Sequence, residues 1–453
     1  MVESFHAAVA RARRHGDLYF AALLSEQSIR KALGSASSLW QGWVYTPAVT
    51  IWVFLSQCLS ADHSCRDAVA RLAAWRVTQG LPPCSAETGA YCTARSQLPE
   101  EACRALVRET GQALEDQAPA EWLLHERRVH VADGSTITMP DTPQNQAEYP
   151  QQKNQHPGCG FPMARVLVIF SLAVGAVLEA AIGKCQGKRT GENSMFRGLH
   201  DSLAEGDVVL ADRYFSGWFD IALLAQRGVD VVLRKHQMRA TDFRTGVRLG
   251  KDDHLVRWTK PPRPTWMTSA EYATLPDELV MREVRVRVTQ RGFRTKRLMV
   301  VTTLRDADEY PTEEIAELYR RRWQAELHLR SLKTVLQMDH LRCKTPHRVR
   351  NEFYMHLLGY NLIRRALALA ALEAGVCPWH ISFKGTLQTL NQFLPLLVVS
   401  MPMAAGCQAL LASIAAHVVG NRPDRYEPRL LKRRPKPYKH LREPRANYKR
   451  QMQ

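Results

Sequence analysis

The chain has 453 residues, with 62 Lys or Arg against 44 Asp or Glu, and carries a formal net charge of +18. This length allows two or three domains, and so basic a balance suggests a polyanionic partner. No Gly-x4-Gly-Lys-Ser/Thr loop and no Gly-x-Ser-x-Gly motif occurs, so ATP-driven chemistry and an acyl-transfer hydrolase are without support.

The N-terminal part of the chain is predicted to be helical. Apolar residues recur at helical spacing near residues 3–14, 48–60, 62–78, 86–97 and 99–116. The last two helices meet at Leu98-Pro-Glu-Glu101 and could form a helix-turn-helix that reads DNA, although a plain helical hairpin is the commoner outcome. We therefore assign residues 1–122 to a helical region that is a candidate for binding DNA ends.

The middle of the chain is predicted to alternate between strands and helices. Apolar and β-branched runs indicate strands at about 128–133, 136–140, 164–172, 175–183 and 229–234, with another that ends at Asp212. Helices are expected at about 192–204 and 217–228. This order indicates an α/β domain with a mixed sheet and helices on both faces.

A β-rich insertion is predicted at about 236–297, where the next helix of the alternation does not appear. Residues 279–288 alternate strictly between apolar and polar or charged side chains, as a half-exposed strand does. Pro261-Pro-Arg-Pro264 indicates a loop, and a strand pattern resumes at 297–303.

Two aspartates stand at the ends of predicted strands. Asp133 ends the first strand and is followed by a glycine that predicts a turn, whereas Asp212 ends a short β-branched run. Hard divalent cations such as Mg²⁺ prefer carboxylate oxygen, yet for either aspartate alone turn capping is the commoner explanation. Four other carboxylates are less favoured: Asp141 is expected in a turn, Asp207 at the wrong end of its strand, and Asp339 without a motif partner, while Glu192 is expected to cap a helix but could border a site.

A later helix carries a charged stripe. Pro311-Thr-Glu-Glu314 predicts its beginning. At about 100° per residue, four side chains fall within a stripe roughly 60° wide: Tyr319, Arg322, Glu326 and Lys333. The alternative is an ordinary solvated face with local ion pairs. The two strand-end aspartates favour a functional site over this alternative. A metal-binding acid flanked by cations suits a nuclease that acts on DNA ends.

The spacing Tyr-x2-Arg-x3-Glu-x6-Lys resembles the YREK signature of the IS-four family of bacterial DDE transposases. The resemblance implies an RNase H-like catalytic domain at residues 123–345, including the β-rich insertion. It also implies that Asp133, Asp212 and Glu326 are the catalytic carboxylates and bind two Mg²⁺ ions, with Mn²⁺ as an alternative. The remaining YREK side chains, and Arg330 on the same helix, would then hold DNA: Tyr319, Arg322 and Lys333.

The function implied by this resemblance is cut-and-paste transposition of a bacterial insertion sequence. Water would cut one strand, and the freed 3′-hydroxyl would attack the opposite strand to form a hairpin and later the target DNA. The partners implied are double-stranded DNA, as terminal inverted repeats and as target, and a second copy of the chain in the DNA complex. Two alternatives remain open: a protein that occupies transposon ends without cutting, and an RNase H-like nuclease for repair or RNA.

Two tryptophans of the predicted insertion are candidates for base stacking. In the family an insertion tryptophan stacks on a flipped base, for which Trp258 or Trp266 is a candidate, although packing within the insertion is the commoner role. Trp323, beside the charged stripe, is expected to be a packing residue.

The C-terminal part is predicted to be helical as far as residue 421. One long helix is expected at 347–375, and no Asp, Glu, Lys or Arg occurs from 385 to 421. Polar and proline residues interrupt that stretch, so buried helices are favoured over a membrane span. We assign 346–421 to a helical region.

A basic tail follows at 422–453. It holds 12 Lys or Arg and 3 Asp or Glu, a net charge of +9. Its density of proline and lysine indicates an extended segment. Four of its cations are predicted to contact DNA phosphates: Lys432, Arg433, Arg434 and Lys436.

The ten cysteines show no Cys-x2-Cys pair, which a structural zinc site usually requires. We therefore expect buried free thiols in a reducing cytoplasm. The first residues lack an apolar stretch after a basic one, so no signal peptide is expected. The protein is predicted to be cytoplasmic, bacterial and associated with the nucleoid.

Overall fold

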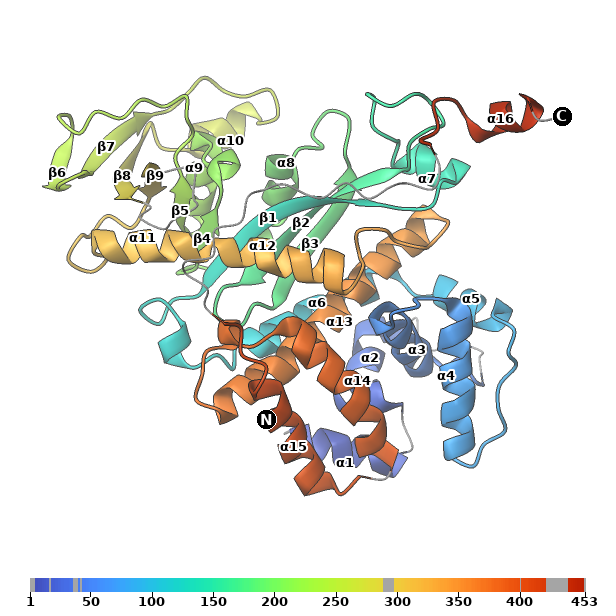
Figure 1. The fold of residues 1–453 in the computed structure, drawn as a ribbon. Coiled ribbons are helices and arrows are strands. Elements are labelled where there is room, and N and C mark those ends of the chain that lie inside the picture. Colours follow the sequence, from blue (N-terminus) through green and yellow to red (C-terminus); the bar gives the residue numbers. More distant parts are fainter. Residues whose placement is uncertain are drawn as a thin grey trace.

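A nine-stranded mixed sheet crosses the computed structural model, which describes residues 5–15, 18–35, 40, 43–287, 297–399, 401–420 and 439–451 (Figure 1). The strand order is β3-β2-β1-β4-β5-β9-β8-β7-β6. β1 pairs in parallel with β4, and β4 with β5, whereas every other neighbouring pair is antiparallel. The strands are β1 Val129–Thr138, β2 Met163–Ser171, β3 Val177–Lys184, β4 Val208–Ala211, β5 Asp230–Arg234, β6 Val247–Gly250, β7 Asp253–Thr259, β8 Glu278–Arg287 and β9 Arg297–Thr302.

Helices cover both faces of the sheet, as predicted. Figure 1 shows α11 and α12 lying end to end across one face, with α8 and α9 beyond the sheet. The helices are α1 Phe5–His15, α2 Glu26–Leu33, α3 Pro47–Leu59, α4 Cys65–Thr78, α5 Gly89–Ser96, α6 Glu100–Glu115, α7 Pro143–Glu148, α8 Glu192–Arg197, α9 Trp218–Gln226, α10 Ser269–Thr274, α11 Thr312–Arg321, α12 Trp323–Arg330, α13 Pro346–Glu373, α14 Phe383–Val399, α15 Met403–Ala415 and α16 Arg445–Gln451. The unit β3-β2-β1-β4-β5 with its helices is the expected RNase H-like mixed sheet.

The alternation of side chains along the strands divides the apolar interior into two cores. Val131 of β1 and Leu210 of β4 belong to the core beneath α12, together with Leu329. Ala132 and Val209, one step away on the same strands, belong to the core beneath α8 and α9. Successive residues on β1 and β4 therefore face opposite layers of helices.

Two local predictions in this domain were wrong. The predicted strands at 128–133 and 136–140 are one strand, β1, which pairs with β2 from His130 to Thr138. Gly134 does not form a turn, because this continuous ladder satisfies the backbone on both sides of it. The helix expected at 192–204 ends at Arg197 and is followed by a short 3-10 turn, His200–Ser202.

The β-rich insertion extends the main sheet. β8 matches the strand expected at 279–288, and β9 pairs on one side with β8 and on the other with β5. β7 and β6 continue the sheet beyond β8. The strands of the insertion therefore belong to the same continuous sheet as the aspartate-bearing strands.

The predicted N- and C-terminal helices pack together. α6 contacts β3 and the long helix α13, and α13 also contacts α3, α14 and α15. Helix α2 was not predicted. The stretch expected to form buried helices contains α14 and α15, and no helix in the described part of the chain is long and apolar enough to cross a membrane.

Two further predictions need correction. Arg445–Gln451 forms helix α16, where an extended tail was expected; Lys432, Arg433, Arg434 and Lys436 lie outside the described residues. All ten cysteines are free, as predicted, but only four are buried: Cys58, Cys103, Cys343 and Cys407.

A buried ion pair connects the insertion to the beginning of α11. Arg282 of β8 is fully buried, and its Nη2 lies 2.6 Å from Oδ2 of Asp253 on β7. The same guanidinium donates from Nη1 to the Tyr310 carbonyl at 2.7 Å. Thr312, the first residue of α11, donates from Oγ1 to Asp253 Oδ2 at 2.7 Å. This network fixes where the helix pair α11–α12 begins relative to the sheet.

Arg282→Met should lower the free energy of unfolding by about 3–5 kcal/mol, because it leaves the Asp253 carboxylate buried without its cation. The matched control is Arg285→Met on the same strand. Arg285 pairs with Asp252 at 2.6 Å, but both side chains are partly exposed, so its loss should cost less than about 1 kcal/mol. Urea unfolding of both variants measures the difference, and equal losses would contradict this role for Arg282.

Candidate active site

The pairing of β1 with β4 brings two aspartates to one place. The last parallel pair joins Val131 to Leu210. Asp133 and Asp212 each follow two residues later, so they occupy equivalent positions beyond the end of that pairing. Beyond Val131, β1 continues beside β2, and its other edge is left free opposite the end of β4. This opening between β1 and the end of β4 is where both carboxylates lie.

The side-chain parity of the strands directs both aspartates toward α12. Asp133 lies two residues after Val131, and Asp212 lies two residues after Leu210. Each aspartate is therefore on the same side of the sheet as that apolar residue, and both apolar residues face the core beneath α12. The strand predicted to end at Asp212 ends one residue earlier, at Ala211, so Asp212 directly follows β4, whereas Asp133 lies within β1. Each carboxylate accepts a local backbone hydrogen bond, Asp133 from Gly134 N at 2.9 Å and Asp212 from Tyr214 N at 2.7 Å.

Helix α12 supplies the third carboxylate. α11 ends at Arg321, and Arg322 retains right-handed helical dihedrals before α12 begins. A π-helical turn, Ser331–Val335, follows α12. An open pocket of about 480 Å³ is lined by Asp133, Gly134, Asp212, Arg322, Glu326, Leu329, Arg330, Lys333 and Thr334. The three predicted catalytic carboxylates therefore line one pocket with three of the predicted DNA-binding cations.

The cations hold the pocket together from both sides. Arg322 Nη2 lies 3.0 Å from Oε1 of Glu326, and Lys333 Nζ lies 3.0 Å from Ser135 Oγ on β1. Lys333 thus connects the π-helical turn to the aspartate-bearing strand. Tyr319 does not line the pocket; it is buried, with the Arg322 guanidinium 5.9 Å from its ring centroid.

Burial makes the Asp133 carboxylate costly to ionise. Desolvation is the largest cause that raises the pKa of Asp133 to about 6, with smaller contributions from Asp212 and Glu326, while the Gly134 hydrogen bond and Arg322 act in the opposite direction. Burial lowers the pKa of Arg322, but Tyr319, Glu326 and Asp133 together raise it above its usual value. Removal from water, more than repulsion by the neighbouring carboxylates, therefore accounts for the raised pKa of Asp133.

A fourth carboxylate borders the pocket. Glu192, the first residue of α8, lies over Gly134: a Cβ at Gly134 would stand 2.7 Å from Glu192 Cδ. Burial raises the pKa of Glu192, Arg165 opposes this, and Asp212 adds to the rise. The sequence prediction treated Glu192 chiefly as a helix cap and allowed that it could border the site. Only glycine at position 134 leaves room for this side chain.

An arginine that sequence reasoning missed lies close by. Arg234 is the last residue of β5, and its neighbour Leu233 pairs in parallel with Ala211, which precedes Asp212. Burial lowers the pKa of Arg234, and the nearby Arg213 and Arg322 lower it further. Aligning the ends of the two predicted parallel strands would have indicated Arg234 as a neighbour of Asp212.

The carboxylate set suits a hard divalent cation. Oxygen ligands from Asp and Glu are those that Mg²⁺ prefers, and Asp133 is a partly buried carboxylate whose own hydrogen bond comes from the adjacent backbone. In the described ranges, no three His, Cys, Asp or Glu side chains are gathered as a ready metal site. Glu326 is instead engaged by Arg322, whose Nη2 donates to its Oε1.

The candidate tryptophans of the insertion are used in packing. Trp258 is buried, donates from Nε1 to Glu283 Oε1 at 3.2 Å, and has the Arg239 guanidinium 4.1 Å from its ring. Trp266 packs against the core beneath α8 and α9, and the Arg197 guanidinium lies 3.7 Å from its ring centroid. Trp323, expected to be a packing residue, is instead 46% exposed.

Comparisons with known proteins agree on one family. The family described as "Transposase DDE domain" matches residues 124–362, more than half of the chain. The transposase InsG for insertion sequence element IS4 of Escherichia coli (strain K12) is 27% identical over 361 residues, which cover 77% of this chain and 77% of that protein. The transposase for insertion sequence element IS421 of Escherichia coli is 39% identical over 66 residues, 15% of this chain and 18% of that protein.

Similar solved structures include a further transposase. The piggyBac transposase in a synaptic complex with hairpin DNA, determined by cryo-EM, aligns with a TM-score of 0.43 and 10% identity over 91% of this chain and 87% of that chain.

Asp133→Asn should stabilise the metal-free protein at neutral pH. The folded pKa of about 6 lies above that of an unfolded aspartate, so the folded state holds the extra proton between the two values and stability falls as pH rises through that window. The rise from 3.8 to about 6 corresponds to about 3 kcal/mol. The variant should gain up to that amount at about pH 7.5 and almost nothing below about pH 4.

Urea unfolding at the two pH values, with a metal chelator present, measures this gain. Asp141→Asn is the control, because Asp141 is exposed and should show little change at either pH. A gain that does not depend on pH, or a loss at neutral pH, would contradict the assignment of Asp133 as a costly buried charge.

Proposed function

Since the chain belongs to the DDE transposases, and within them to the IS-four family, we propose that Asp133, Asp212 and Glu326 are its catalytic carboxylates. The protein is a transposase of an insertion sequence and acts as a polynucleotidyl transferase. The DNA on which it acts is proposed to be the terminal inverted repeats of its own element and a target duplex.

One observation carries this proposal above the others. Three carboxylates from β1, from the end of β4 and from α12 line a single open pocket, although they are far apart in the sequence. Arg322, Arg330 and Lys333 stand around them in the same pocket. Acidic groups for cations beside basic groups for phosphates match the requirements of phosphoryl transfer on DNA.

We propose that the three carboxylates hold two Mg²⁺ ions, with Mn²⁺ as a substitute. When bound, such ions activate the attacking oxygen and stabilise the leaving oxygen in an in-line displacement at phosphorus. Glu326 must give up its ion pair with Arg322 to take part, which frees the Arg322 guanidinium for a phosphate. Lys333, held 3.0 Å from Ser135, would neutralise a second phosphate beside Asp133. Buried Tyr319 orients Arg322.

The order of the cuts is also a proposal. The family resemblance supports cleavage of one strand, attack of the new 3′-hydroxyl on the opposite strand to give a hairpin, and final transfer to target DNA. It also supports pairing of two ends by a homodimer. The basic residues at 432–436 would add salt-dependent contacts to phosphates. An inactive end-binding protein is less favoured, because all three carboxylates and the four YREK residues are present.

Glu326→Gln should abolish Mg²⁺-dependent cleavage of a duplex that carries the DNA next to the reading frame, because an amide is a poor ligand for the cation. The same variant should bind this duplex at least as well as the unmutated protein, since one negative charge leaves the pocket and Arg322 is released. Glu317→Gln is the control: Glu317 is exposed and pairs with Arg320 on α11. Cleavage by Glu326→Gln at the unmutated rate would overturn the site assignment.

Gly134→Ala should lower the cleavage rate by on the order of 10- to 100-fold with little loss of stability. The new Cβ displaces the flexible end of Glu192 from over Gly134, the residue next to Asp133 in β1, and small misplacements in an active site cost rates of this order. Gly183→Ala on β3 is matched, because its Cβ would meet only Met195 at 3.7 Å. Initial cleavage rates and thermal unfolding of both variants test this prediction. Equal cleavage rates would show that the position of Glu192 over Gly134 does not matter for cleavage.

A further inference from the structure

A groove lies on the side of α12 that faces away from the catalytic pocket. Its volume is about 720 Å³, and its walls come from α12, the end of α3 with the loop after it, and the first turns of α14. Gln324, Leu327 and Ser331 line the groove, and at about 100° per residue they lie roughly opposite Arg322 and Glu326. α12 therefore separates two concave surfaces.

The two surfaces meet at shared residues. Arg330 and Thr334 line both the groove and the catalytic pocket. Both side chains are exposed and stand at the rim between the two faces of α12. A chain that entered the catalytic pocket could continue past Arg330 into the groove without crossing a buried layer.

The charged residues that line the groove are all positive. Among the described residues that line it, none is Asp or Glu, whereas Arg330, Arg364 and Lys384 contribute positive charge. Arg321, stacked 4.5 Å from the ring of the groove residue Trp379, adds a further cation beside it. Hydroxyl and amide side chains make up much of the remaining surface: Ser60, Gln324, Ser331, Thr334, Gln337, Ser382, Gln388 and Asn391.

Apolar surface is also available in the groove. Leu327 on α12 is 44% exposed, and Trp379 is half-buried. At the floor, His328 accepts a hydrogen bond at Nδ1 from Arg364, and its buried Nε2 has no partner among the described residues. Cations, hydrogen-bonding groups and exposed apolar faces together suit a polymer that has phosphates, sugars and bases.

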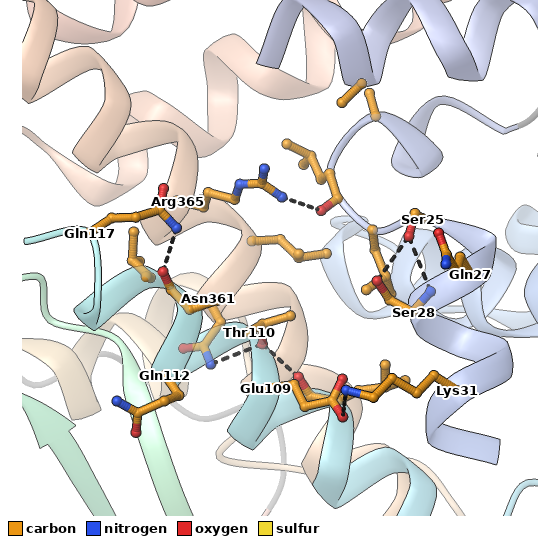
Figure 2. Close-up of a pocket in the computed structure, with 18 of the residues that line it drawn as sticks. Ser25, Gln27, Ser28, Lys31, Glu109, Thr110, Gln112, Gln117, Asn361 and Arg365 are labelled. Carbon is orange, nitrogen blue, oxygen red and sulfur yellow. Dashed lines mark hydrogen bonds and ion pairs between the residues drawn. The ribbon is translucent and has the colours of Figure 1, made fainter. Parts of the chain in front are cut away.

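A second pocket of similar size makes the contrast clear. It measures about 610 Å³ and lies between α2, α6 and α13. Figure 2 shows its Lys31 directed at Glu109, at a distance of 3.2 Å, and Asp116 adds another negative charge to its lining. Its lining holds three cations, Arg11, Lys31 and Arg365, against two acids, so most of its positive charge is offset and it attracts a polyanion less than the groove does.

We propose that the groove binds the DNA strand that continues from the cleavage point, with Lys384 and Arg330 on its phosphates. This inference rests on the proposed function, because it is the shared rim with the catalytic pocket that identifies the occupant as the same DNA. Lys384 lies in the first turn of α14 and is exposed. α12 would then be held between the reacting phosphate on one side and the continuing strand on the other.

Lys384→Gln tests this proposal without touching the catalytic pocket. The probe is a labelled duplex that carries the DNA next to the reading frame, and its dissociation constant is measured by fluorescence anisotropy over a series of NaCl concentrations. Loss of one phosphate contact should reduce the slope of log affinity against log salt by about 0.9. Lys384→Arg should restore the slope.

Lys251→Gln is the matched control, because it removes the same charge from an exposed lysine in the turn between β6 and β7. A slope for Lys384→Gln equal to that of Lys251→Gln would overturn the proposal. As a second readout, the photo-cross-linker p-benzoylphenylalanine in place of Gln388 should capture the labelled DNA, whereas in place of the exposed Gln226 on α9 it should not. Capture of a second protein chain instead of DNA at position 388 would also overturn it.

Mg²⁺-dependent cleavage by the unmutated protein, recorded on the same duplex, separates the two claims. Cleavage with an unchanged salt slope in Lys384→Gln overturns the groove alone and leaves the catalytic assignment intact. Absence of cleavage overturns the catalytic assignment, whatever the slope shows.

Discussion

The parallel pairing of β1 with β4 is the constraint on which the site depends. It joins three residue pairs and stops at Val131 and Leu210. Asp133 and Asp212 lie two residues further along their chains, on the same side of the sheet, where the two strands part. β1 continues along β2 and keeps Asp133 on a rigid ladder. A slip of one residue in the pairing would turn a carboxylate into the opposite core, beneath α8 and α9.

The second constraint is the position of α12 over that opening. Its apolar residues, among them Leu329, bury themselves in the core that Val131 and Leu210 also enter. The same packing brings Glu326 to the aspartates and presents Arg322 and Lys333 beside them. The insertion contributes through Arg282 and Asp253, which anchor the beginning of α11. The site thus combines a strongly packed frame with carboxylates that repel one another, an arrangement in which stability is given up locally for function.

Much of this could be predicted from the sequence, for identifiable reasons. Asp212, the strand at 279–288 and the long helix α13 follow from local patterns that tertiary packing did not change. The stripe of Arg322, Glu326 and Lys333 was predicted on one face, and all three line the pocket. Gly134 was misread as a turn, because a glycine that makes room for Glu192 looks the same in sequence as one that reverses the chain. Glu192, Arg234 and the exposure of Trp323 depend on neighbours from distant segments, which no local pattern contains.

The central claim is that Asp133, Asp212 and Glu326 hold the same divalent ions. The most direct measurement replaces Mg²⁺ with Fe²⁺ and maps the breaks that iron-generated hydroxyl radicals make in the polypeptide, because such radicals cut close to the bound ion. The account predicts that the breaks cluster in β1, at the end of β4 and in α12, and that excess Mg²⁺ suppresses all three clusters together. Breaks confined to other segments, or a pattern without one of these three, would contradict it.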